Sequence, residues 1–423
     1  MTFPNHYTLA TGLYQESHGI VSNIIHDPIT NQTIDLKTSH DPSIYEGEPI
    51  WETVKKHFHT RESGGAVACS MWVACQFGQL GDKYFVKYNE NITLDQRFDQ
   101  AVDWLSDESM KLVLTYYHDP DRTGHNYGPE SKEMNQILID IDLAVGNLIK
   151  NMQDKGMFDE VNVIITGDHG MMERKVPAAV LPAEDTLPKD MFDVWSQTSV
   201  FWLVEPKPGH YKDTLAFFKK FAHLNVTEKG NIPDKWHYKN NPRVPSIVIM
   251  AEPGYALSYA MLGNHGYDNA LKEMRPTFIA HGPAFVANSV APMDMGTVDV
   301  YLLLCTILDV TPAPNNGSAE YFASFVQPAY LIGTKDFVHR LPFVSLIVSI
   351  SVIIFVLTML LCHRARVAAH KNKLGRLRME NNGYMYKPLP LENVGPLLTT
   401  SVDLDLEDSD EFEDTRDLGS RKQ

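Results

Sequence analysis

The sequence predicts an α/β fold with a mostly parallel sheet, and two observations carry this prediction. Two short apolar runs, Leu112–Tyr117 and Val161–Thr166, have the length and composition of buried strands. Between them, Ser131–Lys155 repeats apolar residues at helical spacing and stops before Gly156, a common helix terminator. Strand, helix and strand in this order are expected to form a right-handed parallel crossover.

The other elements are predicted in order along the chain on the same grounds. Thr2–Tyr14 is expected to be a loop leading into a helix that ends at Gly12, and Phe98–Asp107 an amphipathic helix. The apolar stripe from Met134 to Met152 in the long helix is assigned to the core. The remaining candidate strands are 200–204, 247–250 and 277–280, and the remaining candidate helices are 213–223 and 299–308.

Residues that bind metals follow both predicted strands. Asp121 and His125 come after the first strand, and Asp168 and His169 after the second. A third histidine, His265, lies between an asparagine and a glycine. Carboxylate oxygens and imidazole nitrogens are ordinary zinc ligands, and open α/β sheets bind ligands at the carboxyl ends of their strands. A two-metal site is therefore the leading interpretation; the alternative is a loop in which Asp121 caps a turn and His125 is merely polar.

The composition excludes one class of function. The chain has 423 residues and a net charge of −16, so it lacks the excess of Lys and Arg that binding to phosphate backbones needs. A nucleic-acid polymer is therefore not expected as a partner. Part of the acidity lies at 403–417, in a polar C-terminal tail that we expect to be disordered.

One segment has the length and composition of a membrane span. Leu341–Cys362 is uncharged and long enough to cross a bilayer. Basic residues follow it closely: Arg364, Arg366, Lys371, Lys373, Arg376 and Arg378. The positive-inside rule then predicts a single-pass protein with its large N-terminal part extracellular or lumenal and its tail cytoplasmic. The tail segment Tyr386–Leu389 has the form of an endocytic tyrosine signal, which would bind sorting adaptors.

Glycosylation sequons and cysteines fit that orientation. The candidate acceptors all precede the span: Asn31, Asn91, Asn225 and Asn316. Cys69 and Cys75 are close enough in sequence to close a small disulfide loop, which spacing alone cannot establish, and Cys305 is expected to be a buried thiol. The residues from Met1 to His6 do not have the pattern of a signal peptide, so we expect the natural protein to begin upstream.

Taken together, the motifs resemble the ectonucleotide pyrophosphatase/phosphodiesterase family of the alkaline-phosphatase superfamily, most closely its short membrane-anchored members. The resemblance covers residues 1 to about 330 and rests on several segments in a fixed order: 2–7, 11–14, 17–20, 120–129, 168–171 and 264–269. It implies an alkaline-phosphatase-like three-layer sandwich. The implied organisation is a catalytic domain at 1–330, a linker at 331–340, a transmembrane helix at 341–362 and a tail at 363–423.

The resemblance also implies roles for individual residues, whereas without it Thr2 reads as a helix cap and the aromatic residues as core. It implies two zinc ions, with Asp121, His125 and His265 as ligands of one. Thr2 would be the nucleophile. Together with Asp168 and His169 it would also supply three of the four ligands of the second zinc ion. Asn23 would hold the phosphoryl oxygen together with the Thr2 backbone. Phe3 and Tyr88 would be the aromatic pair that sandwiches a nucleotide base, and Tyr116 a further aromatic residue of the pocket.

These roles predict a membrane-anchored ectoenzyme that hydrolyses phosphodiester or pyrophosphate bonds of a nucleotide or dinucleotide. The family also has a metal-binding Asp on a strand before the nucleophile, and this chain starts after that position. The second zinc site is therefore expected to be incomplete and the sheet to lack a central strand. The alternative is a catalytically weak or inactive truncated surface protein, and a third possibility is a relative that acts on phospholipids.

Overall fold

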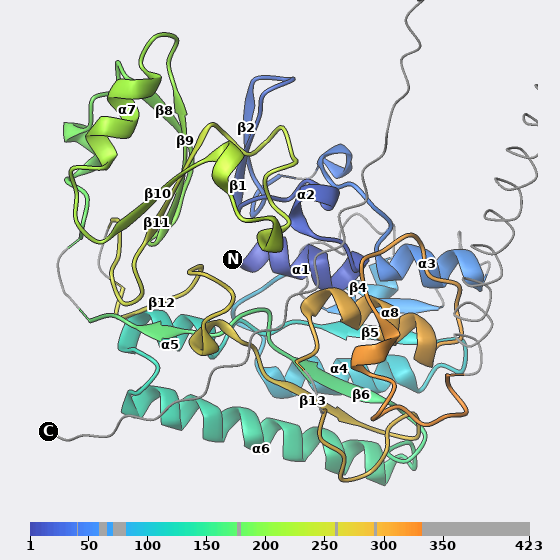
Figure 1. Ribbon diagram of the computed structural model, residues 1–423. Coiled ribbons are helices and arrows are strands. Elements are labelled where there is room, and N and C mark those ends of the chain that lie inside the picture. Colours follow the sequence, from blue (N-terminus) through green and yellow to red (C-terminus); the bar gives the residue numbers. More distant parts are fainter. Residues whose placement is uncertain are drawn as a thin grey trace, which may run out of the picture. The chain divides into compact units, whose positions relative to one another are not determined.

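The computed structural model describes residues 1–39, 41–58, 66–70, 82–175, 179–258, 261–291 and 294–331 (Figure 1). The predicted membrane segment 341–362, the linker, the tail and Cys75 lie outside the described residues. Among the helices that are described, none is long and apolar enough to cross a bilayer. Cys69 is disulfide-bonded, and Cys305 is free and buried as predicted.

The first helix lies near the middle of the described fold. Helix α1 spans Thr2–Thr11 and begins at once, without the preceding loop that the sequence suggested. It ends where predicted, because Gly12 adopts φ 66° and its N–H bonds to the Thr8 carbonyl. Helices α2 (Gln15–His18), α3 (Ile50–His57) and α8 (Thr297–Ile307) pack against α1.

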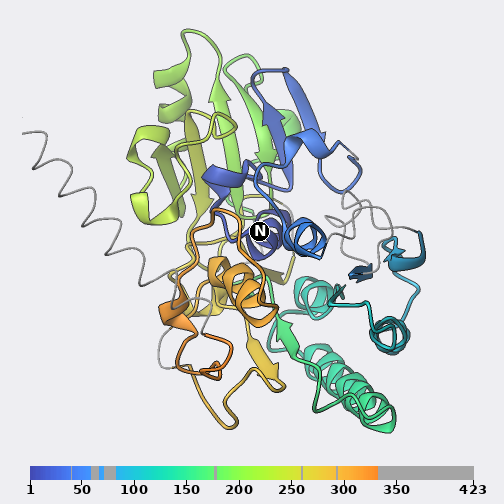
Figure 2. The ribbon, with the colours of Figure 1, turned by 90° about the vertical axis from the view of Figure 1, so that its right-hand side faces the viewer.

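A small parallel sheet holds the strand that precedes the first metal-ligand motif. Its order is β4 (Phe85–Val86), β3 (Val67–Ser70) and β5 (Leu112–Thr115), with both pairings parallel. Helix α4 (Leu94–Leu105), which begins at a capping box earlier than predicted, packs on it. Figures 1 and 2 show α1, α3 and α8 on one side of these strands and α4 and α6 on the other. The result is a layered α/β arrangement.

The long helix α6 (Lys132–Asp154) forms as predicted, but its apolar stripe is only partly core. Met134 and Met152 are buried, whereas Leu138 is 48% exposed. Part of the stripe is exposed because α6 packs mainly on α4 and α5 (Asp121–Tyr127), and these two helices cover only one side of it. Polar pairs join α6 to α4 in register: Asn147 to Asp95, Asn151 to Asp99, and Lys155 to Asp103.

The predicted parallel crossover from the first strand to the second is wrong in its pairing. Strand β6 (Val163–Thr166) forms, but it pairs antiparallel with β13 (Phe278–His281). Within the described residues, β5 and β6 are not hydrogen-bonded neighbours. The described sheets are therefore mixed rather than mostly parallel: β3 pairs parallel with β4 and β5, whereas β6 pairs antiparallel with a strand from far along the chain.

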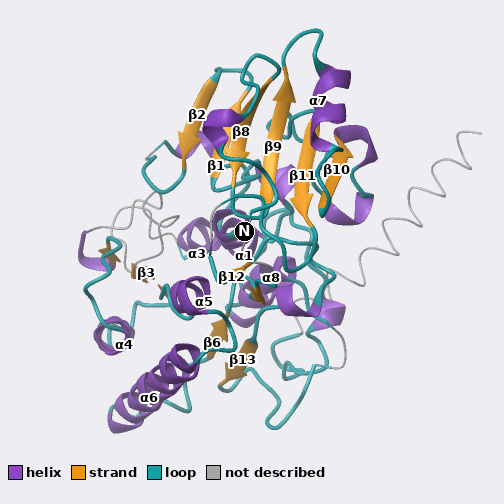
Figure 3. Cartoon of the chain, turned by 90° about the vertical axis from the view of Figure 1, so that its left-hand side faces the viewer, coloured by secondary structure: helices purple, strands orange, loops and turns teal. Residues whose placement is uncertain are grey.

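A second, antiparallel sheet was only partly predicted. Its order is β10 (Leu224–Glu228), β11 (Ile247–Ala251), β9 (Phe201–Pro206) and β8 (Phe192–Gln197). The hairpin of β1 (Ile24–Asp27) and β2 (Gln32–Asp35) lies beside β8 (Figure 3). Helix α7 (Tyr211–Phe218) ends earlier than predicted, and β10 follows it. Trp202 and Ile249 are among the buried residues that make this sheet part of the main core.

Candidate metal centre and active site

Helix α5 places the first two metal-ligand candidates on one side. Asp121 and His125 are four residues apart, so they lie one above the other on the helix surface. His125 Nδ1 donates a hydrogen bond to the Gly263 carbonyl at 2.9 Å, which fixes the ring and leaves Nε2 with its lone pair. That Nε2 lies 3.3 Å from Asp121 Oδ1. The pair is thus oriented toward a common point.

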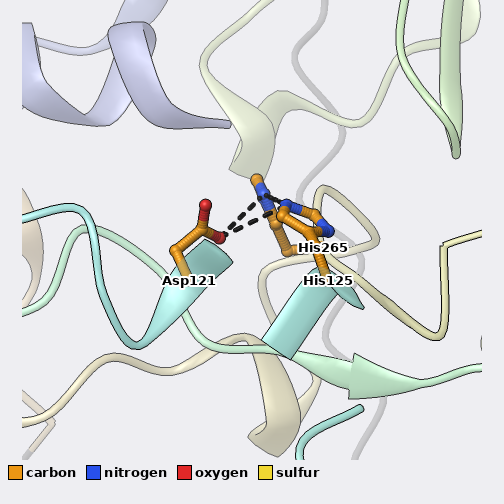
Figure 4. Close-up of side chains that lie close together, drawn as sticks. All are labelled: Asp121, His125 and His265. Carbon is orange, nitrogen blue, oxygen red and sulfur yellow. Dashed lines mark hydrogen bonds and ion pairs between the residues drawn. The ribbon is translucent and has the colours of Figure 1, made fainter. Parts of the chain in front are cut away.

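A short antiparallel pair brings His265 to the same point from far along the chain. Strand β12 (Gly263–Asn264) pairs with β7 (Met172–Glu173). A side chain at Gly263 would place its Cβ 2.3 Å from the Gly124 carbonyl oxygen, so only glycine permits this approach. His265 Nε2 then lies 3.1 Å from His125 Nε2 and 3.5 Å from Asp121 Oδ1 (Figure 4).

The resulting triad fits a metal cation. The donor atoms of Asp121, His125 and His265 all lie within 4.8 Å of one another. Among the described residues, Asp121 Oδ1 and His265 Nδ1 are buried and have no hydrogen-bond partner. Burial raises the pKa of Asp121 and holds the pKa of His265 well below its ordinary value, so the imidazole is neutral and can donate its lone pair. Nitrogen and oxygen donors in this arrangement are the chemistry that a divalent metal selects.

A second group of donors lies beside the triad, at the end of β6. His169 Nε2 lies 3.2 Å from Asp168 Oδ2 and 3.5 Å from Thr2 Oγ1. The His169 ring also stacks on His265 with centroids 3.5 Å apart, and its Nε2 lies 3.9 Å from Asp121 Oδ1. The structure therefore brings all of the metal-ligand residues that the sequence predicted into one place.

Close backbone packing and neighbouring charges define the second group. At Gly170 a Cβ would lie 2.0 Å from the Glu273 carbonyl oxygen, so the turn after His169 requires glycine. Burial lowers the pKa of His169 to about 4. Burial by itself would raise the pKa of Asp168, but His6 and His169 outweigh it and hold this pKa below its usual range. Asp168 is therefore a carboxylate and His169 a neutral imidazole at pH 7.

The proposed nucleophile and its neighbour Asn23 meet at the start of α1. Thr2 is the first residue of the helix, where backbone N–H groups lack partners within the helix. The Phe3 N–H donates to Asn23 Oδ1 at 3.0 Å, which leaves the amide hydrogens of Asn23 as its free donors. Thr2 and Asn23 are thus adjacent through the Phe3 backbone, as the predicted roles require.

The aromatic candidates form a connected group. The Tyr88 and Tyr116 ring centroids lie 6.2 Å apart, and Tyr116 packs against His6 at 5.1 Å. The Phe3 ring also lies next to His6, with the two ring centroids 6.3 Å apart. His6 also places Nε2 3.3 Å from Asp168 Oδ2, so it links the aromatic group to a metal-ligand candidate. Sequence reasoning missed His6, although its position four residues after Thr2 in a helix was the available signal.

The candidate glycosylation residues are exposed in the structure. Asn31 lies in the turn of the β1–β2 hairpin, and Asn225 lies in β10. Asn91 lies just before α4. Asn316 is exposed too, but its Oδ1 accepts a hydrogen bond from the Tyr14 N–H. Each side chain is therefore at the surface, and only for Asn316 is a hydrogen bond of the side-chain amide recorded.

Comparisons with known proteins agree with this geometry. Residues 1–268 match the family model "Type I phosphodiesterase / nucleotide pyrophosphatase". The human ectonucleotide pyrophosphatase/phosphodiesterase family member 5 is 37% identical over 329 residues, which cover 75% of this chain and 67% of the relative. The Xenopus laevis bis(5'-adenosyl)-triphosphatase enpp4 is 37% identical over 332 residues, which cover 75% of this chain and 70% of that protein. A solved structure of an inactive threonine-to-alanine variant of murine ENPP5 in complex with AMP has a TM-score of 0.70 and 34% identity, and the match covers 77% of this chain and 88% of that one.

Proposed function

Because this chain belongs to the type I phosphodiesterase/nucleotide pyrophosphatase family of hydrolases, we propose that it cleaves nucleotide phosphodiester or pyrophosphate bonds through Thr2. The fold is alkaline-phosphatase-like, with mixed sheets that include a parallel one. The single observation that carries the proposal is the convergence of Asp121, His125 and His265 beside Asp168, His169 and Thr2. No other described group of His, Cys, Asp and Glu forms such a set.

The residues present fit one zinc ion and offer three ligands to a second, whose site is incomplete, as the sequence suggests. Asp121, His125 and His265 would hold one, and Thr2, Asp168 and His169 would supply ligands to the other. The oxygens Asp121 Oδ1 and Asp168 Oδ2 support this assignment. Both are buried and face imidazole nitrogens, and a cation between such groups would compensate the buried negative charge. Zinc bound there would favour the ionised form of the Thr2 hydroxyl and offset the negative charge of the phosphoryl oxygens.

The chain's own residues then supply positioning and the nucleophile. Thr2 Oγ gives up its proton to solvent and attacks phosphorus. The bond to the leaving oxygen breaks, the leaving phosphate departs with the bonding electrons, and the nucleotidyl group becomes an ester of Thr2. The Asn23 side-chain amide and the Thr2 N–H donate to the phosphoryl oxygen, since helix N-termini favour anions. Water then attacks the same phosphorus, releases the nucleoside monophosphate and restores the Thr2 hydroxyl.

A dinucleotide is the substrate class that we propose. The aromatic rings that suit a nucleobase lie next to His6, which contacts Asp168 of the site. Phe3 and Tyr116 contact the His6 ring, and Tyr88 contacts Tyr116. The Xenopus relative is a bis(5'-adenosyl)-triphosphatase, and the murine relative was solved with AMP. Diadenosine triphosphate, cleaved to AMP and ADP, is therefore the first substrate to test.

We also propose that the protein is anchored in a membrane through 341–362, with the catalytic domain extracellular or lumenal and the tail cytoplasmic. The uncharged segment followed by basic residues supports this orientation. The exposure of Asn31, Asn91, Asn225 and Asn316 agrees with it, because each could accept a glycan at the surface. Glycosidase digestion of the cell-surface protein should reduce its apparent mass; no mass change would contradict the orientation.

The test is hydrolysis of diadenosine triphosphate by the purified full chain supplied with zinc, with products separated by chromatography. We expect AMP and ADP, loss of activity with a chelator, and recovery with added zinc. Thr2→Ala should lower kcat by about a thousandfold or more with bound zinc largely retained, whereas Asp121→Asn should also lower the bound zinc.

A matched control is Asp142→Asn, which removes an exposed carboxylate of α6 away from the site. It should leave kcat/KM within about twofold of the wild type. A folded wild-type chain that holds zinc and hydrolyses neither dinucleotides nor nucleotide esters would refute the proposed function and favour a non-catalytic surface protein. Preferential hydrolysis of choline-phosphate esters would instead favour the phospholipid-directed alternative.

A further inference from the structure

A fully buried arginine stands behind the aromatic group of the site. Arg97 on α4 has no exposed surface, although charged side chains are rarely buried without a specific partner. Its hydrogen bonds within the described residues all go to backbone carbonyls. Nε donates to Ile92 at 3.0 Å, Nη2 to Asn89 at 3.0 Å and Nη1 to Tyr116 at 2.6 Å. The planar guanidinium is the side chain whose fixed set of donors can hold several carbonyls at once.

The three carbonyls belong to two segments that are separate in sequence. Asn89 and Ile92 lie in the loop that follows β4 and carries Tyr88, while Tyr116 directly follows β5. The guanidinium also lies 5.2 Å from the centre of the Tyr117 ring, a distance typical of a cation–π contact. Arg97 therefore joins the loop that carries one ring of the aromatic group to the strand end that carries another.

Two other described ties of this loop are weaker. Strand β4 has only two residues, paired with Cys69 and Ser70 of β3. The ion pair between Arg122 and Glu90 joins two half-exposed side chains, and such pairs contribute little because water and salt screen them. Hydrogen bonds from a buried cation are much stronger in the low dielectric of the interior. Arg97 thus ties the loop that carries Tyr88 directly to the backbone of Tyr116.

We propose that Arg97 is a positioning residue that sets the separation of Tyr88 and Tyr116, and thereby the preference for phosphodiesters that carry a nucleobase. This inference rests on the proposed nucleotide hydrolysis. Arg97 contacts neither the metal-ligand candidates nor Thr2 in the described structure, so the chemistry at phosphorus does not need it. A residue needed only for folding would affect every substrate alike, whereas a positioning residue of this pocket affects only substrates that fill it.

The experiment compares two esters with the same leaving group on the zinc-loaded full chain. The first is the 4-nitrophenyl ester of thymidine 5'-monophosphate, and the second is 4-nitrophenyl methyl phosphate, which has no base. Arg97→Lys keeps the charge but loses the planar set of donors, so it should lower kcat/KM for the nucleoside ester by about tenfold, chiefly through KM. The base-free ester should change by less than about twofold.

Two further variants provide the controls. Tyr88→Ala should reproduce the selective loss on the nucleoside ester, and adding Arg97→Lys to it should cause little further loss, because both changes remove the same platform. Arg243→Lys is a matched control. Arg243 is also buried and donates to the Gly19 and Ile44 carbonyls, but it pairs with Asp27 and has no recorded contact with Tyr88 or Tyr116. It should leave the ratio of the two kcat/KM values unchanged.

The outcomes separate this inference from the function on which it rests. The inference is supported if Arg97→Lys lowers kcat/KM for the nucleoside ester alone, mainly by raising KM, and Arg243→Lys does not. Equal losses on both esters, or no loss on either, would overturn it while the wild-type enzyme still turns over both. A wild-type chain that hydrolyses neither ester would overturn the proposed function and this inference with it.

Discussion

Protonation of one buried histidine should make the fold sensitive to acid. His18 is the last residue of helix α2 and is completely buried. Its Nδ1 accepts a hydrogen bond from the Ile20 N–H at 3.1 Å, so Nε2 carries the hydrogen and donates to Thr8 Oγ1 at 3.0 Å. Both ring nitrogens of the neutral form are satisfied. A second proton on Nδ1 would face the Ile20 N–H in a dry site.

The magnitude follows from the pKa. Burial lowers the pKa of His18 from its ordinary 6.5 to about 3. Below pH 6.5 the unfolded chain therefore binds a proton that the folded chain does not, and the free energy of unfolding falls as the pH falls. The contribution of this one residue is a loss of about 1.4 kcal/mol at pH 5.5 and about 2.7 kcal/mol at pH 4.5, relative to pH 7.5.

The assay is urea unfolding of the wild type and of His18→Asn at pH 7.5, 5.5 and 4.5 with saturating zinc. Asn can keep an acceptor for the Ile20 N–H but cannot be protonated. We expect the variant to be less stable at pH 7.5 by about 1 to 3 kcal/mol, and this gap to shrink by the two amounts above as the pH falls. A gap that stays constant at all three pH values would refute the argument that His18 is buried as the neutral form.

The other predictions concern packing at glycine and at a thiol. Gly170→Ala should destabilise the fold by several kcal/mol in urea unfolding, because its Cβ would lie 2.0 Å from the Glu273 carbonyl oxygen. Gly146→Ala in α6 should stabilise the fold by about 1 kcal/mol, because its Cβ would meet no atom within 4 Å. Equal effects of the two variants would contradict the packing. Burial raises the pKa of Cys305 to about 12, so a thiol reagent at pH 8 should leave the Cys305 peptide unmodified until urea unfolds the chain, as mass spectrometry would record. Rapid labelling of the native chain would contradict its burial.

Local pattern predicted most of the elements and the metal-ligand residues. Leu112–Thr115, Val163–Thr166 and the helix over Lys132–Asp154 form as expected, because apolar period and length depend on near neighbours alone. Asp121 and His125 could be paired from sequence by their four-residue spacing, but the short helix α5 on which they lie was not predicted; a loop was expected there. The resemblance supplied Thr2 and Asn23, which no periodicity singles out.

Long-range pairing was the main source of error. Strand β13 joins the edge of β6 from more than a hundred residues away, and nothing in either apolar run indicates which partner it will take. The wrong assignment of Leu138 to the core has the same cause. The helical spacing of apolar residues predicts an apolar stripe, but it does not predict how many neighbouring elements cover that stripe. Arg97 was overlooked because an arginine on an amphipathic helix is usually a solvated residue.

The sequence by itself determined the α/β class, the family and the chemical type of the site, since residue order and local spacing encode all three. Only the tertiary structure decided which residues meet. The β7–β12 pair carries His265 to α5, α1 carries Thr2 to within 3.5 Å of His169, and Arg97 joins the Tyr88 loop to Tyr116. The physical reason is that these contacts depend on the burial and packing of segments far apart in the chain, which no local pattern specifies.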